Sequence, residues 1–359
     1  MGTATAEDGT LRIGAPPRWL RLLPIVLLAA LVLAQGVTPG DVELGAYYAA
    51  VAPLAALGYG VAGTAVVAAA VVVVMELPVV GPGTLVGAEL GAVVLIGVLS
   101  VVIAALQQRF RGRLVLARSV AEAAQLAVLA PVPGTVGEVR CAALYRAAQR
   151  GTLVGGDLYD VRPGPHGVVR ALVADVQGHG LAAVGTVAAL LGAFREAVLD
   201  QRELRGVAGR LERRLALDAA GNAELFATAL LMEFPDDGSW VRLVCQGHPP
   251  ALLLRGRQVR ELECDPGPPL GAGLPGQAPA LPSVVTLLPG DVILAYTDGV
   301  TEARDASGAF YPLAERLAAR LAEGAARSPE AVVDGVWEDL RRYAGAVGDD
   351  VALLALAPR

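Results

Sequence analysis

Four stretches of the sequence place an aspartate beside an apolar run and next to glycine. These aspartates are Asp157, Asp175, Asp298 and Asp349. A carboxylate at the end of a buried strand costs free energy unless water or a cation compensates its charge, and glycine lets a ligand approach the backbone. Aspartates without His or Cys partners suit hard cations such as Mg²⁺ or Mn²⁺. A single aspartate of this kind is better explained as part of an ordinary turn. Four of them in one domain favour a shared metal centre. The residue types by themselves leave both interpretations open.

The aspartates lie in a region, residues 136–359, whose pattern predicts an α+β domain. Short apolar and β-branched runs separated by glycine are typical of strands. Most of these runs are consecutive and joined by short turns, which indicates hairpins and antiparallel sheets. The expected strands cover 139–145, 157–162, 167–175, 225–234, 239–246, 250–255, 291–297 and 350–356, and the expected helices cover 181–199, 202–219, 312–323 and 328–343.

Charge and cysteine content exclude several classes of function. The net charge is −6 and the basic residues are scattered, so the chain lacks the basic patch of a nucleic-acid-binding protein and we expect no nucleic-acid partner. Three cysteines, Cys141, Cys245 and Cys264, have no paired spacing. This argues against a disulfide framework and a structural zinc site, and it favours a reducing, cytosolic compartment for the region after residue 107.

The first third of the chain predicts a transmembrane region over residues 20–107. A membrane-spanning helix needs about 20 mostly apolar residues. The stretch 44–78 is too long for one span and short for two, with Gly58, Gly60 and Gly63 as the expected turn. We therefore expect four spans, with three as the alternative. The four expected spans cover 20–37, 44–60, 61–78 and 87–107.

Arginines on both sides of this region predict its orientation. Positive charge favours the cytoplasmic side of a membrane, so both ends should be cytoplasmic, which requires an even number of spans. We expect a multi-pass protein of the cell membrane, in contact with lipid, with a cytoplasmic tail at 1–19 and a linker helix at 108–135. The flanking arginines are Arg12, Arg18 and Arg21 before the first span, and Arg109, Arg111, Arg113 and Arg118 after the last.

Small and apolar residues recur at spacings of three and four along the expected linker helix. Such a seam suits pairing with a second helix and hence a homodimer, although a helix packed on its own domain remains the alternative. The seam comprises Phe110, Leu114, Ala117, Ala121, Ala124 and Val128.

Six motifs in order make the chain resemble the bacterial stage-II-sporulation-E-like branch of the PP2C phosphatases. The resemblance runs from about residue 122 to the C-terminus and implies two antiparallel sheets packed face to face and flanked by helices. The motifs are Gly-Gly-Asp-Leu-Tyr-Asp (155–160), Ala-Asp-Val-Gln-Gly-His-Gly (174–180), Phe-Ala-Thr-Ala (226–229), Gly-His-Pro-Pro (247–250), Pro-Gly-Asp (289–291) with Tyr-Thr-Asp-Gly-Val-Thr-Glu-Ala (296–303), and Asp-Asp-Val-Ala-Leu-Leu (349–354). Cys245 and Gln246 stand where this family usually has a small residue.

By this resemblance, the catalytic residues hold two divalent cations, Mn²⁺ or Mg²⁺, which activate a water molecule for attack on phosphorus. The implied metal ligands are Asp157, Asp175, Asp298, Asp349 and the backbone carbonyl of Val176. Second-shell roles are expected for Asp160, Asp350 and His179, although His179 is more typical of a structural hydrogen bond than of a general acid.

The resemblance implies a metal-dependent protein-serine/threonine phosphatase acting on a signalling protein. In this family the usual substrate resembles a phosphorylated anti-sigma-factor antagonist. The alternative is a catalytically silent membrane receptor or scaffold whose domain only binds a partner.

Overall fold

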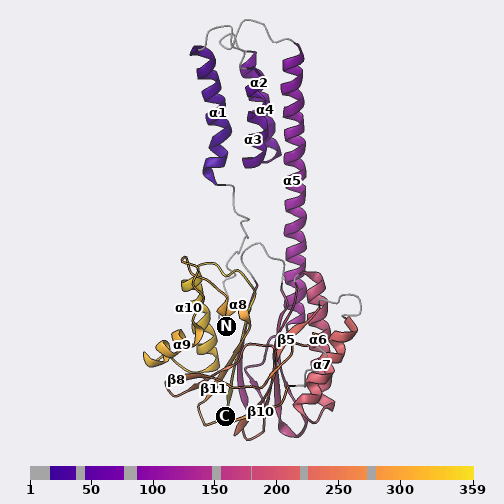
Figure 1. Ribbon diagram of the computed structural model, residues 1–359, viewed down its shortest axis with the longest axis vertical. Coiled ribbons are helices and arrows are strands. Elements are labelled where there is room, and N and C mark those ends of the chain that lie inside the picture. The colour runs from indigo at the N-terminus through magenta and orange to yellow at the C-terminus, as the bar shows by residue number, and fades with distance from the viewer. Residues whose placement is uncertain are drawn as a thin grey trace, which may run out of the picture. The chain divides into compact units, whose positions relative to one another are not determined.

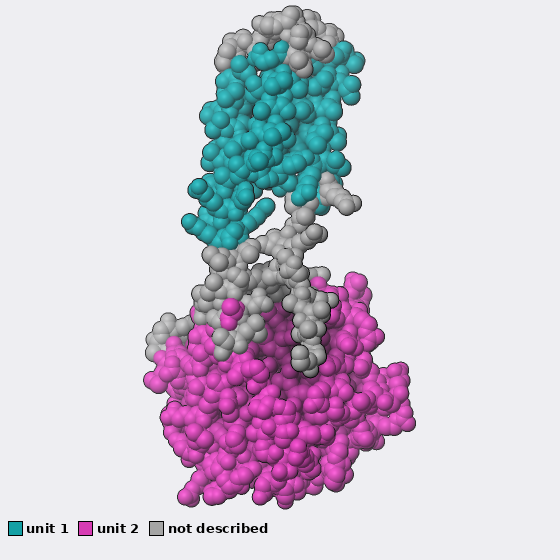
Figure 2. Space-filling view, turned by 180° about the vertical axis from the view of Figure 1, so that it is seen from behind, with its two compact units in different colours: residues 1–116 teal, residues 117–359 magenta. Residues whose placement is uncertain are grey.

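The computed structural model describes residues 17–37, 45–76, 87–147, 155–178, 180–218, 225–272 and 280–359. The chain divides into two compact units, Met1–Leu116 and Ala117–Arg359 (Figure 2). The boundary between the units falls inside the expected linker helix. The expected N-terminal tail is almost wholly outside the described residues.

The first unit consists of apolar helices. They are α1 (Arg18–Val37), α2 (Gly45–Tyr48), α3 (Val51–Gly58), α4 (Val61–Met75) and the first part of α5 (Gly87–Val128). Helix α3 packs against both α1 and α4. Gly58 permits this approach, because a Cβ atom at this position would lie only 2.9 Å from the carbonyl oxygen of Leu20.

Two helices of this unit are long and apolar enough to cross a membrane, at Trp19–Val37 and Leu90–Arg113. They correspond to the first and last expected spans. The middle stretch forms two shorter apolar helices, Gly45–Gly58 and Val61–Met75, which meet close to the expected glycine turn. A third helix of sufficient length, Ala182–Asp200, belongs to the second unit and is half buried there, so packing within the domain accounts for its apolar character.

The start of α1, the α3–α4 turn and a late part of α5 lie at the same end of the first unit. The Tyr59 hydroxyl donates to the carbonyl oxygen of Arg21 at 2.7 Å. A Cβ atom on Gly60 would lie 3.7 Å from Oε1 of Gln108, and all four residues line one pocket. The start of α1 and Gln108 of α5 therefore both lie beside the α3–α4 turn, at one end of the first unit.

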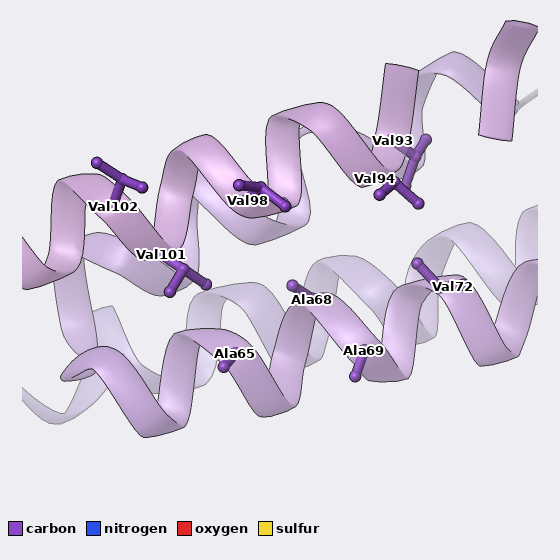
Figure 3. A pocket seen from close by; sticks show the side chains of 10 residues that line it. Ala65, Ala68, Ala69, Val72, Val93, Val94, Val98, Val101 and Val102 are labelled. Carbon is purple, nitrogen blue, oxygen red and sulfur yellow. The ribbon is translucent and has the colours of Figure 1, made fainter. Parts of the chain in front are cut away.

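Small side chains line an apolar groove between α4 and α5, with a volume of about 310 Å³ (Figure 3). Ala65, Ala68 and Ala69 of α4 lie along it opposite the valines of α5. A Cβ atom on Gly97 would lie 3.3 Å from the Cβ of Ala68, so this glycine lets the two backbones come close.

The second unit contains two six-stranded sheets in its described residues. All strand pairs are antiparallel except β6 with β9. The strand order in sheet A is β1 (Thr135–Val136), β2 (Val139–Arg146), β12 (Val351–Pro358), β11 (Val292–Tyr296), β7 (Leu252–Arg255) and β8 (Gln258–Glu261). The strand order in sheet B is β10 (Ser283–Thr286), β6 (Trp240–Gln246), β5 (Ala227–Phe234), β4 (Val169–Val176) and β3 (Asp157–Pro163). Strand β9 (Pro266–Gly267) also belongs to sheet B and pairs with β6. The eight expected strands are confirmed, and β1, β8, β9 and β10 are additional.

Four longer helices flank the sheets, as expected (Figure 1). Helices α6 (Leu181–Asp200) and α7 (Leu204–Asp218) contact sheet B, while α9 (Leu313–Ala322) and α10 (Pro329–Ala344) contact sheet A. This confirms the α+β prediction of two packed sheets between helices.

Strand β11 shows how one sheet serves two cores. Successive side chains of a strand point to opposite faces. Ile293 and Ala295 join the core that sheet A shares with sheet B, whereas Val292, Leu294 and Tyr296 pack towards α9 and α10. A strand buried on both faces carries a continuous apolar run, which explains why this strand is easy to recognise in the sequence.

Candidate active site

The predicted carboxylates lie at strand ends in both sheets. Asp157 begins β3 and is the cross-strand partner of Asp175 near the end of β4. Asp298 begins the short helix α8 (Asp298–Thr301) just after β11, and Asp349 and Asp350 directly precede β12. Because β11 and β12 are neighbours, sheet A contributes three carboxylates close together and sheet B contributes two.

The two sets of carboxylates lie close enough to affect the pKa values of one another. Burial raises the pKa of Asp175 to about 7, with further increases from the charges of Asp298, Asp349 and Asp350. Burial and the charge of Asp175 likewise raise the pKa of Asp157 well above its usual value. Carboxylates that lie this close together are more readily protonated in the absence of a cation, and a nearby cation would favour their ionised forms.

Hydrogen bonds from the protein hold two of these carboxylates in place. The buried Thr297 hydroxyl donates to Oδ2 of Asp157 at 2.6 Å and accepts from the amide of Ala352 at 2.9 Å. Asp350 accepts from the hydroxyl of Tyr145 and, at 2.9 Å, from the amide of Gly155. These bonds join both sheets at the site.

Two glycines allow the backbone to close around the carboxylates. A Cβ atom on Gly156 would lie 1.9 Å from the carbonyl oxygen of Val176, and one on Gly299 would lie 1.9 Å from that of Asp350. Any larger residue at either position would push a strand end away from the site. The carbonyl of Val176, expected to be a ligand, therefore lies against the loop that carries Asp157.

This donor set fits hard divalent cations, because it offers only carboxylate and carbonyl oxygens. Among the described residues, no three His, Cys, Asp or Glu side chains yet lie close enough to hold one ion together. Asp157 and Asp175 share a side-chain hydrogen bond, and Asp157 also accepts from the hydroxyl of Thr297. The carboxylates thus gather at one place and have the chemistry of metal ligands, and they lie farther apart than the ligands of a single bound ion.

Asp160 lies away from this cluster, contrary to the second-shell role expected from its motif. Its carboxylate accepts from Nε of Arg195 in α6 at 2.6 Å and from Nε of Arg162 at 3.0 Å. Asp160 is three residues after Asp157, so it points to the opposite face of β3. It fastens α6 to sheet B. His179 lies outside the described residues.

A family model, Stage II sporulation protein E (SpoIIE), matches residues 165–359, more than half of the chain. The chain belongs to this family. Three of the four expected carboxylate ligands, Asp175, Asp298 and Asp349, lie inside the matched region, and Asp157 lies just before it. The second unit is therefore a SpoIIE/PP2C-type serine phosphatase domain, and the family it belongs to is metal-dependent.

Solved structures agree with this assignment. The RsbU and RsbW domains of Rv1364c from Mycobacterium tuberculosis match with 26% identity and a TM-score of 0.54, over 64% of this chain and 62% of that one. The PP2C phosphatase domain and a regulatory fragment of SpoIIE from Bacillus subtilis match with 19% identity and a TM-score of 0.52, over 61% and 63%. The SiaA-PP2C domain of Pseudomonas aeruginosa matches with 20% identity and a TM-score of 0.55, over 71% and 100%.

The match spans less than two thirds of the length of the first two structures. No curated protein matches the chain. The similarity to the second and third structures supports the fold alone.

Two residues of this SpoIIE-family site were not predicted from the sequence. Thr297 directly precedes Asp298 within the motif at 296–303, so the sequence could have indicated its place in the site. Tyr145 lies in β2, outside the motifs, and only the pairing of β2 with β12 brings its hydroxyl to Asp350.

Proposed function

We propose that this protein is a membrane-anchored, metal-dependent protein-serine/threonine phosphatase whose catalytic domain faces the cytosol. The observation that carries the proposal is the group of carboxylates that strand pairing and the bond from Thr297 to Asp157 bring together at the strand ends of both sheets. Structural ion pairs do not explain this group, because each neighbour that raises the pKa values of Asp157 and Asp175 is another carboxylate. Membership of the SpoIIE family supports the same interpretation.

The proposed ligands are Asp157, Asp175, Asp298, Asp349 and the carbonyl of Val176. Two bound divalent cations would supply a hydroxide from water at neutral pH. The chain itself positions the site: Thr297 orients the proposed ligand Asp157, and Tyr145 with the amide of Gly155 orients the neighbouring Asp350. Residues that orient ligands in this way commonly affect metal affinity 10–100-fold.

The proposed substrate is phosphoserine or phosphothreonine on a signalling protein. The relative from Mycobacterium tuberculosis combines RsbU and RsbW domains, which supports a place in Rsb-type signalling. A phosphorylated anti-sigma-factor antagonist remains the partner that we propose.

The anchor is the first unit. We propose four crossings, because the start of α1 and a late part of α5 lie at the same end of this unit and arginines flank both. The short helices of the middle pair fall below the length of about 20 residues that a full span needs. The α3–α4 hairpin would therefore cross a locally thinner layer or remain partly within the bundle.

The experiment measures hydrolysis of a generic phosphate ester and of a phosphoserine peptide by the full chain in detergent, with and without Mn²⁺. Asp175→Asn and Asp298→Asn should each lower kcat by roughly two orders of magnitude or more, because a neutral amide oxygen replaces a charged ligand. Asp237→Asn is the matched control. It makes the same change in the exposed β5–β6 turn, at the end of β5 away from Asp175.

Near-normal turnover of both ligand variants at saturating Mn²⁺ would contradict the metal mechanism. Absence of Mn²⁺-dependent hydrolysis in the unsubstituted protein, with either substrate, would favour the silent receptor or scaffold instead.

A further inference from the structure

Two of the sequence motifs meet beside the candidate active site, although neither supplies a proposed metal ligand. Thr228 belongs to Phe-Ala-Thr-Ala (226–229), and His248 belongs to Gly-His-Pro-Pro (247–250). Oγ1 of Thr228 lies 2.8 Å from Nδ1 of His248, so the two side chains are hydrogen-bonded. This bond gives both motifs a common place in the fold.

Strand pairing places Thr228 next to the proposed ligands. Thr228 in β5 is the cross-strand partner of Asp175 in β4, which is in turn the partner of Asp157 in β3. Residues directly opposite each other in an antiparallel pair point to the same face of the sheet, with Cβ atoms about 4.5–5.5 Å apart. The side chain of Thr228 therefore extends the row of Asp157 and Asp175 by one strand.

The backbone after β6 brings His248 to this row. Gly247 has a φ of 66°, a left-handed conformation that favours glycine, and a Cβ atom there would lie 2.6 Å from Cγ of Pro269. Gly247 also forms a β-bridge with Ala229 near the start of β5. Sγ of Cys245 donates to the carbonyl oxygen of His248 at 3.2 Å. These contacts hold the histidine beside the start of β5.

Stability alone does not explain a histidine at this position. His248 is 5% exposed. Burial lowers the pKa of its ring to about 4, against a smaller opposite effect from the backbone of Tyr296, so the ring is neutral at neutral pH. Nε2 is buried and makes no hydrogen bond of normal geometry with the described residues. Because a buried polar atom without a partner destabilises a fold, packing by itself would favour an apolar ring, and the bond to Thr228 is what distinguishes histidine from phenylalanine here.

We propose that His248 is a positioning residue of the candidate active site, which holds the hydroxyl of Thr228 so that this hydroxyl donates to the carboxylate of Asp175. A carboxylate that binds a cation is ionised and only accepts hydrogen bonds. Thr228 must therefore donate to Asp175 and accept from Nδ1–H of His248. The inference rests on the proposed function, because it concerns Asp175 as a metal ligand. Hydrogen bonds that orient metal ligands commonly change metal affinity by about 10–100-fold.

The test measures binding of Mn²⁺ to the full chain in detergent by isothermal titration calorimetry, without any phosphatase substrate. His248→Phe keeps a ring and removes both nitrogens, and Thr228→Val removes the hydroxyl. Each should raise the apparent dissociation constant for Mn²⁺ about 10-fold. The double variant should show no larger change than either single one, because both act through the same bond.

Conservative variants separate positioning from packing. His248→Asn places an amide N–H close to the place of Nδ1, and Thr228→Ser keeps the hydroxyl, so both should bind Mn²⁺ with nearly the affinity of the unsubstituted protein. A histidine that only fills space predicts the opposite order, since phenylalanine fills that space and asparagine does not. Thr286→Val is the matched control: it lies in the exposed part of β10 opposite Trp240, at the end of sheet B away from Asp175.

An unchanged Mn²⁺ affinity of His248→Phe or of Thr228→Val would refute the positioning role. Fold-changes that multiply in the double variant would also refute it, as would weak binding by His248→Asn. Thr228 is only half-buried, so Thr228→Val decides the matter even if the buried His248→Phe does not fold.

Failure of the proposed function gives a different result. The unsubstituted protein would then bind no Mn²⁺, or would bind it as tightly after Asp175→Asn, and the role of His248 would be refuted with it. Binding that Asp175→Asn abolishes and Thr228→Val leaves intact would refute the role of His248 alone.

Discussion

Replacing Thr297 by valine removes one buried hydroxyl group while keeping the shape of the side chain. That hydroxyl donates to Asp157 at 2.6 Å and accepts from the amide of Ala352 at 2.9 Å. Loss of a hydrogen bond to a charged group costs about 1.5–3 kcal/mol, and a buried amide left without a partner costs about 1–3 kcal/mol. Because burial raises the pKa of Asp157, we take the lower part of both ranges and expect the free energy of unfolding to fall by about 2.5–4 kcal/mol.

The same change should weaken metal binding. Asp157 loses the donor that fixes its carboxylate, so the Mn²⁺ concentration for half-maximal phosphatase activity should rise about 10–100-fold. At saturating Mn²⁺ the kcat should recover most of its original value, since no ligand has been removed. Thr297→Ser restores the hydroxyl and should restore both properties.

Thr301→Val is the matched control. Its hydroxyl bonds only to the carbonyl oxygen of Asp298, at 3.2 Å, on the same short helix. Stability is measured by chemical denaturation of the full chain, followed by the fluorescence of Trp240 and Trp337 in a Trp19→Phe background. An unchanged Mn²⁺ dependence for Thr297→Val, or a stability loss no larger than that of Thr301→Val, would refute the positioning role of Thr297.

Three further changes test other parts of the molecule. Arg170→Met should lower the free energy of unfolding by about 3–5 kcal/mol, because it leaves the buried Glu233 carboxylate short of a partner; the exposed Arg210→Met should cost at most about 1 kcal/mol. Reporter fusions at residue 15 and residue 359 should both label from the cytosol, and labelling from opposite sides would require an odd number of crossings. Ala121→Glu in α5 should convert a dimer of the full chain to monomers in analytical ultracentrifugation, whereas a chain monomeric from the start, or a dimer unaffected by this change, would exclude pairing through that seam.

The eight predicted strands and four predicted helices could be found because their sequences carry strong local signals. Strands buried on both faces, such as β11 and β12, have continuous apolar runs. The short strands β8 and β10 are half exposed and have no such run. They become strands because their backbones pair with β7 and β6, and this pairing depends on the fold and not on local propensity.

The candidate site was likewise predictable from the sequence only in part. The carboxylates that gather at the strand ends were recognisable, because each follows or precedes an apolar run beside glycine, and several motifs in order are specific to a family. Their common location required the pairing of β3 with β4 and of β11 with β12. The seam along α5 remains a prediction, since the side chains of Leu114, Ala117, Ala121 and Ala124 lie outside the described residues.

What the sequence alone determined is therefore the composition of the site and the order of the elements that carry it, because hydrophobic pattern and residue chemistry are local properties. Only the tertiary structure decided which side chains meet. Asp160 shares a motif with Asp157, yet strand alternation turns it towards Arg195 in α6. Tyr145 shows no signal in its neighbourhood, and the pairing of β2 with β12 brings its hydroxyl to Asp350. Contacts between distant segments arise from how the sheets close around one core, which no single stretch of sequence specifies.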